Sequence, residues 1–177
     1  AGTDVLKGGS GNDIITGKAG TDNLTGGSGN DTFNVDSGTD TITDLGTGSD
    51  ILVVSSGATA NATNVSSFTA TSATRNSGTA TINSVAGGST VDMSSSGLGG
   101  FTLAGNAGVD NLTGGSNNDI ITGAGGNDII IGGAGNDTIT GGANNDSLTG
   151  SAGNDTFNVD SGTDTTVSYT HLTLPTK

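Results

Sequence analysis

The chain has 177 residues and a net charge of −13 at pH 7, with 34 glycines, one proline and no cysteine. The negative charge excludes nucleic acid as a natural partner and disfavours anionic membranes, the absence of cysteine excludes disulfides, and no apolar run is long enough for membrane insertion. Hydrophobic residues make up 29% of the chain and aromatic residues 3%, which is too little for an ordinary core.

Residues 1–50 carry a nine-residue repeat of the form Gly-Gly-x-Gly-x-Asp-x-U-x, in which U is a large apolar residue. The glycine-rich part predicts a tight turn, and the last three residues, such as Ile14-Ile15-Thr16, predict a short strand. One inward side chain per strand indicates a thin, two-sheeted solenoid with two repeats to each coil. The repeat aspartates of this block are Asp4, Asp13, Asp22, Asp31 and Asp40, and the U residues are Leu6, Ile15, Leu24, Phe33 and Ile42.

The repeat ends in a turn-rich stretch, where Asp44 and Asp50 are out of phase and are expected to be solvated. Residues 51–103 lack the nine-residue period and form a β-rich insert of short strands. This insert either continues the solenoid or packs as a small sandwich; a spacer is the simpler interpretation, although its surface offers a place for a partner. The predicted strands are Ile51–Val54, Phe68–Thr74, Thr79–Val85, Ser89–Met93 and Phe101–Leu103.

A second repeat block covers residues 104–166. Its segment Gly153–Thr165 is identical to Gly29–Thr41, which indicates a fragment of a protein with long tandem units. The final residues, Val167–Lys177, resemble translated sequencing adapter, so we expect a non-native tail. The aspartates of this block are Asp110, Asp119, Asp128, Asp137, Asp146, Asp155 and Asp164, and the U residues are Leu112, Ile121, Ile130, Ile139, Leu148 and Phe157.

Aspartates eighteen residues apart should line up in columns at the inter-strand spacing of about 4.8 Å. At that distance two carboxylates repel by about 1 kcal/mol in water and about 3.5 kcal/mol at an effective dielectric of 20, so a column requires cations. Carboxylates and turn carbonyls supply only oxygen, which favours calcium over magnesium or zinc. The expected carbonyls lie around Gly9, Gly11, Gly27, Gly29, Gly115, Gly126, Gly133 and Gly135.

The two blocks resemble the hemolysin-type calcium-binding repeats of secreted RTX proteins. The resemblance covers about three-fifths of the chain and implies an all-β fold, a parallel β-roll with about eight calcium ions between adjacent coils, interrupted by a calcium-free insert. The pairs it implies are Asp4 with Asp22, Asp13 with Asp31, Asp22 with Asp40, Asp110 with Asp128, Asp119 with Asp137, Asp128 with Asp146, Asp137 with Asp155, and Asp146 with Asp164.

Several repeats depart from the consensus, and sites near them are predicted to be weaker or empty. Asparagine can replace the fourth-position glycine because it tolerates the left-handed region. The departures are Asn117 and Asn144 at the fourth position, Lys18, Asn106, Ala124 and Ser151 at the second, and Val35-Asp36 and Val159-Asp160 at the first two.

The composition and the resemblance together predict a calcium-binding structural region of a large secreted or cell-surface bacterial protein. It would be largely disordered without calcium, fold outside the cell, and serve as a scaffold or adhesin-like stalk for an unidentified extracellular partner. The alternative is the export-assisting region of a type I-secreted toxin or hydrolase. HExxH and GxSxG motifs are absent and the one histidine, His171, lies in the tail, so no enzyme is expected. A calcium-dependent ice-binding solenoid fits less well, because serine and alanine occupy the third turn position where that relative favours threonine.

Overall fold

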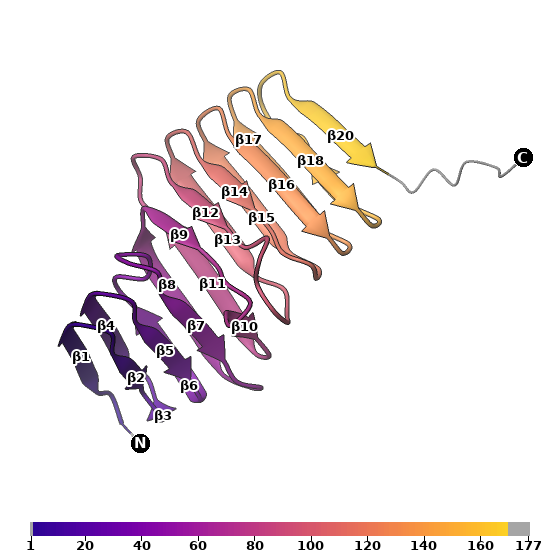
Figure 1. The fold of residues 1–177 in the computed structure, drawn as a ribbon. Coiled ribbons are helices and arrows are strands. Elements are labelled where there is room, and N and C mark those ends of the chain that lie inside the picture. The colour runs from indigo at the N-terminus through magenta and orange to yellow at the C-terminus, as the bar shows by residue number, and fades with distance from the viewer. Residues whose placement is uncertain (1, 170–177) are drawn as a thin grey trace, which may run out of the picture.

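The computed structural model describes residues 2–169, and every regular element in this range is a β-strand. Neighbouring strands pair in parallel and stack as successive coils along one axis, with the first and last coils at opposite ends (Figure 1). The expected all-β parallel roll is therefore confirmed. Residues 2–169 contain no helix with the length and apolar character needed to cross a membrane.

One continuous sheet runs along the whole roll. It has ten strands, whose order is β1-β4-β6-β8-β11-β13-β15-β17-β19, with the short β3 paired to β6. These strands are β1 (Val5–Ser10), β3 (Ala19–Gly20), β4 (Asn23–Ser28), β6 (Ser37–Ile42), β8 (Thr59–Val65), β11 (Thr79–Ser84), β13 (Thr102–Ala107), β15 (Ile120–Gly125), β17 (Thr138–Ala143) and β19 (Thr156–Asn158).

The opposing face is divided into two sheets, because the same coil contributes β9 to one and β10 to the other. The four-stranded sheet has the order β10-β7-β5-β2, and the six-stranded sheet has the order β20-β18-β16-β14-β12-β9. The strands are β2 (Ile14–Thr16), β5 (Thr32–Val35), β7 (Ile51–Val54), β9 (Ser67–Thr69), β10 (Arg75–Asn76), β12 (Thr90–Asp92), β14 (Asn111–Thr113), β16 (Ile129–Ala134), β18 (Ser147–Ala152) and β20 (Thr165–Tyr169).

Apolar residues at position U form the interior, one from each strand. Leu6 pairs with Leu24 and Ile121 with Ile139, so two nine-residue repeats complete one coil, as predicted. Burying each such side chain contributes about 1.5–3 kcal/mol. The buried U residues are Ile15, Leu24, Phe33, Ile42, Leu112, Ile121, Ile130, Ile139 and Leu148, while Leu6 and Phe157 near the two ends are partly buried.

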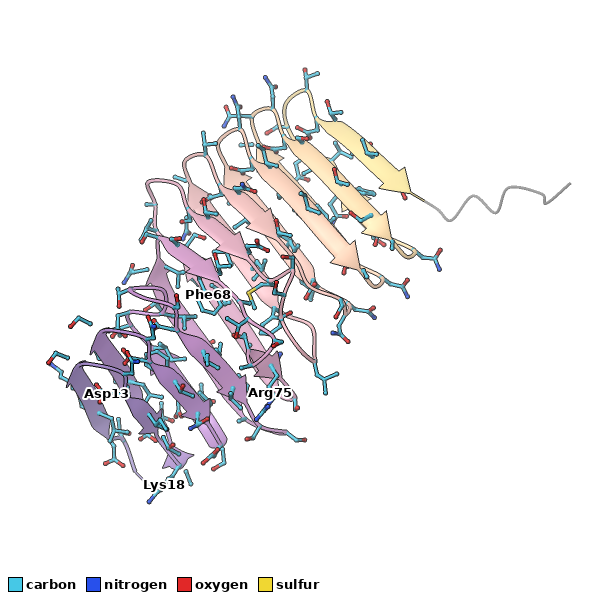
Figure 2. The ribbon with its side chains drawn as sticks, viewed as in Figure 1. Asp13, Lys18, Phe68 and Arg75 are labelled. Atoms are coloured by element: carbon cyan, nitrogen blue, oxygen red, sulfur yellow. The ribbon has the colours of Figure 1, made fainter. Side chains whose placement is uncertain are left out.

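Residues 51–103 continue the roll and do not form a separate sandwich. β7 pairs with β5 and β13 pairs with β15, so the insert is hydrogen-bonded to both repeat blocks. The predicted strand over 68–74 is wrong in its bounds, because β9 ends at Thr69 and β10 begins at Arg75; Phe68 is buried between the layers (Figure 2). β8 was not predicted, since its inward residues Ala60 and Ala62 are weak strand formers.

The last strand extends past the predicted start of the tail. Thr165–Tyr169 form β20, which pairs with β18, so Val167 belongs to the last strand of the six-stranded sheet. These residues are β-prone and continue the phase of the repeat, with Thr166 opposite Leu148. The rest of the predicted tail, 170–177, lies outside the described residues, and the boundaries drawn at residues 50, 103 and 166 stay predictions.

Candidate metal centre

Eleven of the twelve repeat aspartates lie directly before a strand, and Asp40 lies within β6, so the aspartates form a column along each of the two edges of the roll. Eight of the twelve are buried with 0–3% of their surface exposed, which is unusual for a carboxylate. The edge that leads into the ten-stranded sheet holds Asp4, Asp22, Asp40, Asp119, Asp137 and Asp155, and the opposite edge holds Asp13, Asp31, Asp110, Asp128, Asp146 and Asp164.

Within each column, the Oδ1 atom of one aspartate accepts a hydrogen bond from the backbone N–H of the aspartate one coil earlier. The N–H of Asp119 donates to Oδ1 of Asp137 at 2.8 Å, and the N–H of Asp128 donates to Oδ1 of Asp146 at 2.8 Å. All eight pairs implied by the resemblance are linked in this way, at 2.8–3.0 Å. The fold therefore brings the expected partners together.

The other carboxylate oxygen, Oδ2, is buried without a hydrogen-bond partner in most of these residues. A buried charged oxygen that has neither a donor nor a cation carries a large desolvation cost. Such an atom marks a place where a positive ion would be stabilised. The aspartates with an unpartnered Oδ2 are Asp13, Asp22, Asp31, Asp40, Asp110, Asp128, Asp137, Asp146 and Asp155.

The first glycine of each repeat leaves room for this oxygen. A Cβ on Gly8 would lie 2.5 Å from Oδ2 of Asp13 and 2.7 Å from the carbonyl oxygen of Gly26 in the next coil. These glycines do not have positive φ, so they are required by the close approach alone. Carbonyls that share the space with Oδ2 in this way belong to Gly26, Gly123, Gly132, Gly141 and Gly150.

Those first-position carbonyls were not among the predicted ligands. The sequence did contain a signal, because the first position is glycine in nine repeats whereas the second accepts lysine, asparagine, alanine and serine. Of the predicted carbonyls, those of Gly9, Gly11 and Gly115 lie beside the equivalent glycine one coil on. The predicted set of carbonyl ligands stays a prediction.

Substituted second and fourth positions keep the left-handed backbone. Lys18, Ala124 and Ser151 have φ of 67°, 78° and 74°, and Asn144 has φ of 86°. Each side chain there carries a local strain of the order of 1–2 kcal/mol, and that of Lys18 points outward from the edge of the roll (Figure 2). Asn117 differs from the expectation, because its φ is not positive.

Two carboxylate oxygens from adjacent coils, those of Asp22 and Asp40, share the space beside Gly17. The Oδ2 atoms of both lie 2.7 Å from the point that a Cβ on Gly17 would occupy. Burial raises the pKa of Asp40, and the nearby charges of Asp22 and Asp36 raise it further against the backbone hydrogen bond from Asp22. Neither Oδ2 has a hydrogen-bond partner, so a cation at this point would stabilise both carboxylates.

Asp119 begins the second block on its edge and has both oxygens satisfied. Its Oδ1 accepts from the N–H of Phe101 and its Oδ2 from the N–H of Gly115, each at 2.7 Å. Burial raises its pKa to about 6, although these two hydrogen bonds oppose the shift. Asp119 therefore lacks the unpartnered Oδ2 that most of the other repeat aspartates have.

The expectation that Asp50 is a solvated turn residue is wrong. Asp50 is 1% exposed and takes the next place in the column of Asp13 and Asp31, accepting from the N–H of Asp31 at 2.9 Å and of Gly46 at 2.8 Å. The turn before β7 contains one extra residue, so Asp50 follows Asp31 by 19 residues and not by the 18 of the other pairs. Asp44 is half-buried, and its two oxygens accept from the N–H groups of Gly26 and Gly27, so it is not solvated either.

An asparagine ladder on the outside of the turns was missed by sequence reasoning. The fifth-position asparagine accepts a hydrogen bond from the backbone of the following coil, as Asn136 does from the N–H of Asn154 at 2.8 Å. Aspartate Oδ1 reaches the preceding coil, so each turn is held from both sides. In the sequence, the frequent Asn-Asp pair at the fifth and sixth positions could have indicated this ladder. The acceptors are Asn12, Asn30, Asn118, Asn127, Asn136 and Asn145.

Burial raises the pKa values of the inner aspartates above the ordinary range. For Asp128 and Asp137 burial is the largest cause, and it is reinforced by the negative charges of the column neighbours Asp146 and Asp155. For Asp110 burial also raises the pKa, although contacts with Ser89 oppose the shift. The metal-free roll therefore holds protons that the unfolded chain releases.

Acid should stabilise the metal-free protein. Because the folded pKa of Asp119 is raised to about 6 from 3.8 and those of its neighbours are raised as well, the stability that protonation provides is complete below about pH 4 and is lost as the pH rises through the folded values. Far-ultraviolet circular dichroism of metal-free protein should show β signal growing as the pH falls from 7 to 4. A β signal that falls over this range would contradict the raised pKa values.

The donors along the columns fit calcium. No point within residues 2–169 gathers three or more acidic or imidazole side chains, so each site supplies at most two carboxylates, and backbone carbonyls must complete it. An oxygen-only set of mixed carboxylates and carbonyls is the coordination that calcium accepts, whereas zinc prefers nitrogen and sulfur.

Comparison with known proteins agrees with this chemistry. The family model for the RTX calcium-binding nonapeptide repeat (4 copies) matches residues 7–42, 104–139 and 131–166, which together make up more than half of the chain. No curated protein and no solved structure matches the chain significantly.

Proposed function

Because the chain belongs to the RTX calcium-binding nonapeptide repeat family, we propose that its two blocks bind calcium between adjacent coils and fold as a result. The protein is a calcium-binding repeat region with a parallel β-roll fold. Its proposed setting is a large secreted or cell-surface bacterial protein, where external calcium would be available at about millimolar concentration, the range of extracellular calcium modules.

The unpartnered Oδ2 atoms carry this proposal. In the middle of the second block, Oδ2 of Asp128 and the carbonyl of Gly141 share the space under Gly123, and Oδ2 of Asp137 and the carbonyl of Gly150 share the space under Gly132. A divalent ion bound there supplies the positive charge that both coils lack. The chain's own contribution is to hold two oxygens from adjacent coils at a fixed separation, so that binding one ion joins two coils.

Calcium binding and folding are then one process. The unfolded chain has no preformed site, so the binding free energy appears as folding free energy. About eight ions would carry about +16, enough to offset the net charge of −13. The twelve repeat aspartates are the proposed ligands, with Asp119 the weakest because its oxygens already accept two backbone hydrogen bonds.

A scaffold or stalk is the proposed role of the roll. Gly29–Thr41 and Gly153–Thr165 are identical, which fits a tandem array. The first contributes β5 to the four-stranded sheet and the second contributes β19 to the ten-stranded sheet, so the same residues fold on either face. Further copies in the adjoining coding sequence would favour the stalk, whereas an adjoining catalytic motif would favour an export-assisting region of a toxin or hydrolase.

The test is calcium titration calorimetry of the wild type and Asp137→Asn. Asparagine keeps an oxygen that can accept the N–H of Asp119 but removes the charge of Oδ2, so the two sites that share Asp137 should weaken by about tenfold or more, in line with the loss of a charge-assisted contact worth about 1.5–3 kcal/mol. Asp160→Asn is the matched control, because Asp160 is exposed and out of phase. An isotherm for Asp137→Asn identical to the wild type would overturn the proposed ligand columns.

A further inference from the structure

Buried charge is confined to the two ends of the roll. The described part of residues 51–103 has no buried aspartate, and its buried polar residues, Thr74, Asn76, Ser84, Ser89 and Ser96, are all uncharged. The desolvation and repulsion of buried carboxylates, which calcium would relieve, are therefore absent from residues 51–103. The buried aspartates outside it are Asp22, Asp31, Asp40, Asp50, Asp110, Asp119, Asp128, Asp137 and Asp146.

Apolar residues replace the carboxylate column in the centre. Along the edge of the ten-stranded sheet, Asp40 pairs with Ala60 and Ala60 with Ala80. The next coil has Phe101, whose N–H donates to Asp119, where the column resumes. Ala60, Ala80 and Phe101 are 0–2% exposed. Stacking these side chains at the inter-strand spacing costs no electrostatic energy and buries apolar surface.

The centre also buries the larger share of the apolar core. Of the 25 buried hydrophobic residues, 14 lie in 51–103, although that segment is less than a third of the chain. They include the large side chains of Phe68, Met93 and Phe101. Each repeat coil in the blocks depends on two U residues. The centre is thus the one part of the described chain whose core is dense and whose turns carry no repelling charges.

We propose that residues 51–103 form a calcium-independent nucleus, from which the coils of both blocks are added outward as they bind calcium. β7 and β8 present their edges to β5 and β6 of the first block, and β12 and β13 present theirs to β14 and β15 of the second. The first coil on each side adds to a strand edge that is already formed, so its ordering cost is offset at once by pairing with a folded neighbour and no second nucleus is needed. This inference rests on the calcium-linked folding proposed above.

Hydrogen exchange of the full chain tests the order of folding. In chelator at pH 7, amides of β7, β8 and β11 should exchange more slowly than those of β1, β4, β16 and β18, which should be close to unprotected. On adding calcium, protection should reach β6 and β15 at lower calcium than β1 and β18. A single calcium midpoint for all strands, or protection of β16–β18 before the centre, would overturn the nucleus.

Two matched substitutions separate the nucleus from an ordinary coil. Ile82 in β11 and Ile139 in β17 are both 0% exposed interior residues. Ile82→Ala should raise the calcium midpoint of both blocks severalfold, whereas Ile139→Ala should raise that of the second block and leave the first unchanged. Ile82→Val, a milder cavity, should shift both midpoints in the same direction and keeps the test usable if Ile82→Ala does not fold. Equal effects of Ile82→Ala and Ile139→Ala on the first block would overturn the proposal.

Calcium-linked folding and the central nucleus are distinguished by which strands gain protection. If the blocks gain no protection with calcium at any concentration, the proposed function fails. If the blocks respond to calcium but the centre is unprotected in chelator, the nucleus alone fails.

Discussion

Removing calcium at neutral pH should abolish most of the β structure of the two repeat blocks. Far-ultraviolet circular dichroism in chelator should then show mainly disordered chain, and a calcium titration should restore the β signal cooperatively at about 0.1–1 mM. The reason is electrostatic: each neighbouring pair of aspartates costs about 3.5 kcal/mol at an effective dielectric of 20 when no cation lies between them. Several such pairs exceed what one interior residue per strand can offset.

Magnesium is the control for this titration. It is smaller, requires near-ideal octahedral geometry and keeps its waters, so it should restore little β signal at the same concentration. A spectrum that is already fully β-rich in chelator would show that hydrogen bonds from the aspartate and asparagine ladders suffice without an ion. In that case a calcium-free solenoid would be the better description of the blocks.

The nine-residue period made the coil architecture predictable. Because the aspartates and U residues recur without a slip inside each block, the pairing of Leu6 with Leu24 and the inward position of Ile139 followed from the spacing alone. The pairing of aspartates eighteen residues apart followed in the same way. A strict repeat supplies the register that a single strand cannot, since each copy constrains its neighbours.

Features that depend on exact residue counts outside the repeat were not predictable. The turn before β7 contains one extra residue, which the chain absorbs locally with the N–H of Thr47 donating to the carbonyl of Asp44, and this returns Asp50 to the column. A fixed nine-residue frame treats Asp50 as out of phase. Likewise the buried Ala62 of β8 lies between Ile42 and Ile82 of the neighbouring coils, an arrangement that no local pattern reveals.

The requirement for glycine at the first position of the repeat could not be predicted from local conformation. Glycine in a turn suggests positive φ, which holds for the second and fourth positions, where Ala124 and Asn144 nevertheless keep that backbone. Gly132 has an ordinary φ, and its requirement comes from Oδ2 of Asp137, five residues later, and from the next coil. A contact between coils cannot be read from the conformation of one residue, so the tertiary structure was needed to assign it.

Gly132→Ala should therefore be among the most damaging single substitutions in the second block. The added Cβ would overlap Oδ2 of Asp137 and lie 2.8 Å from the carbonyl oxygen of Gly150, both of which are proposed to face the ion. Overpacking of this kind costs about 1–3 kcal/mol, and displacing Oδ2 would weaken calcium binding as well. The calcium midpoint of the second block, followed by hydrogen exchange of β16 and β18, should rise by about tenfold, while that of the first block should not change.

Gly125→Ala is the matched control, because Gly125 has an ordinary φ and a Cβ there would meet nothing closer than the carbonyl oxygen of Asn106 at 4.0 Å. Alanine at that site should be neutral or stabilise by a few tenths of a kcal/mol through the unfolded chain. The contrast matters more than either value, since both variants add one methyl group to the same block. If both variants shift the calcium midpoint equally, the reduced backbone freedom of any alanine would explain why the first position is glycine. A shift confined to Gly132→Ala would instead assign that requirement to the space that carboxylate, carbonyl and calcium share.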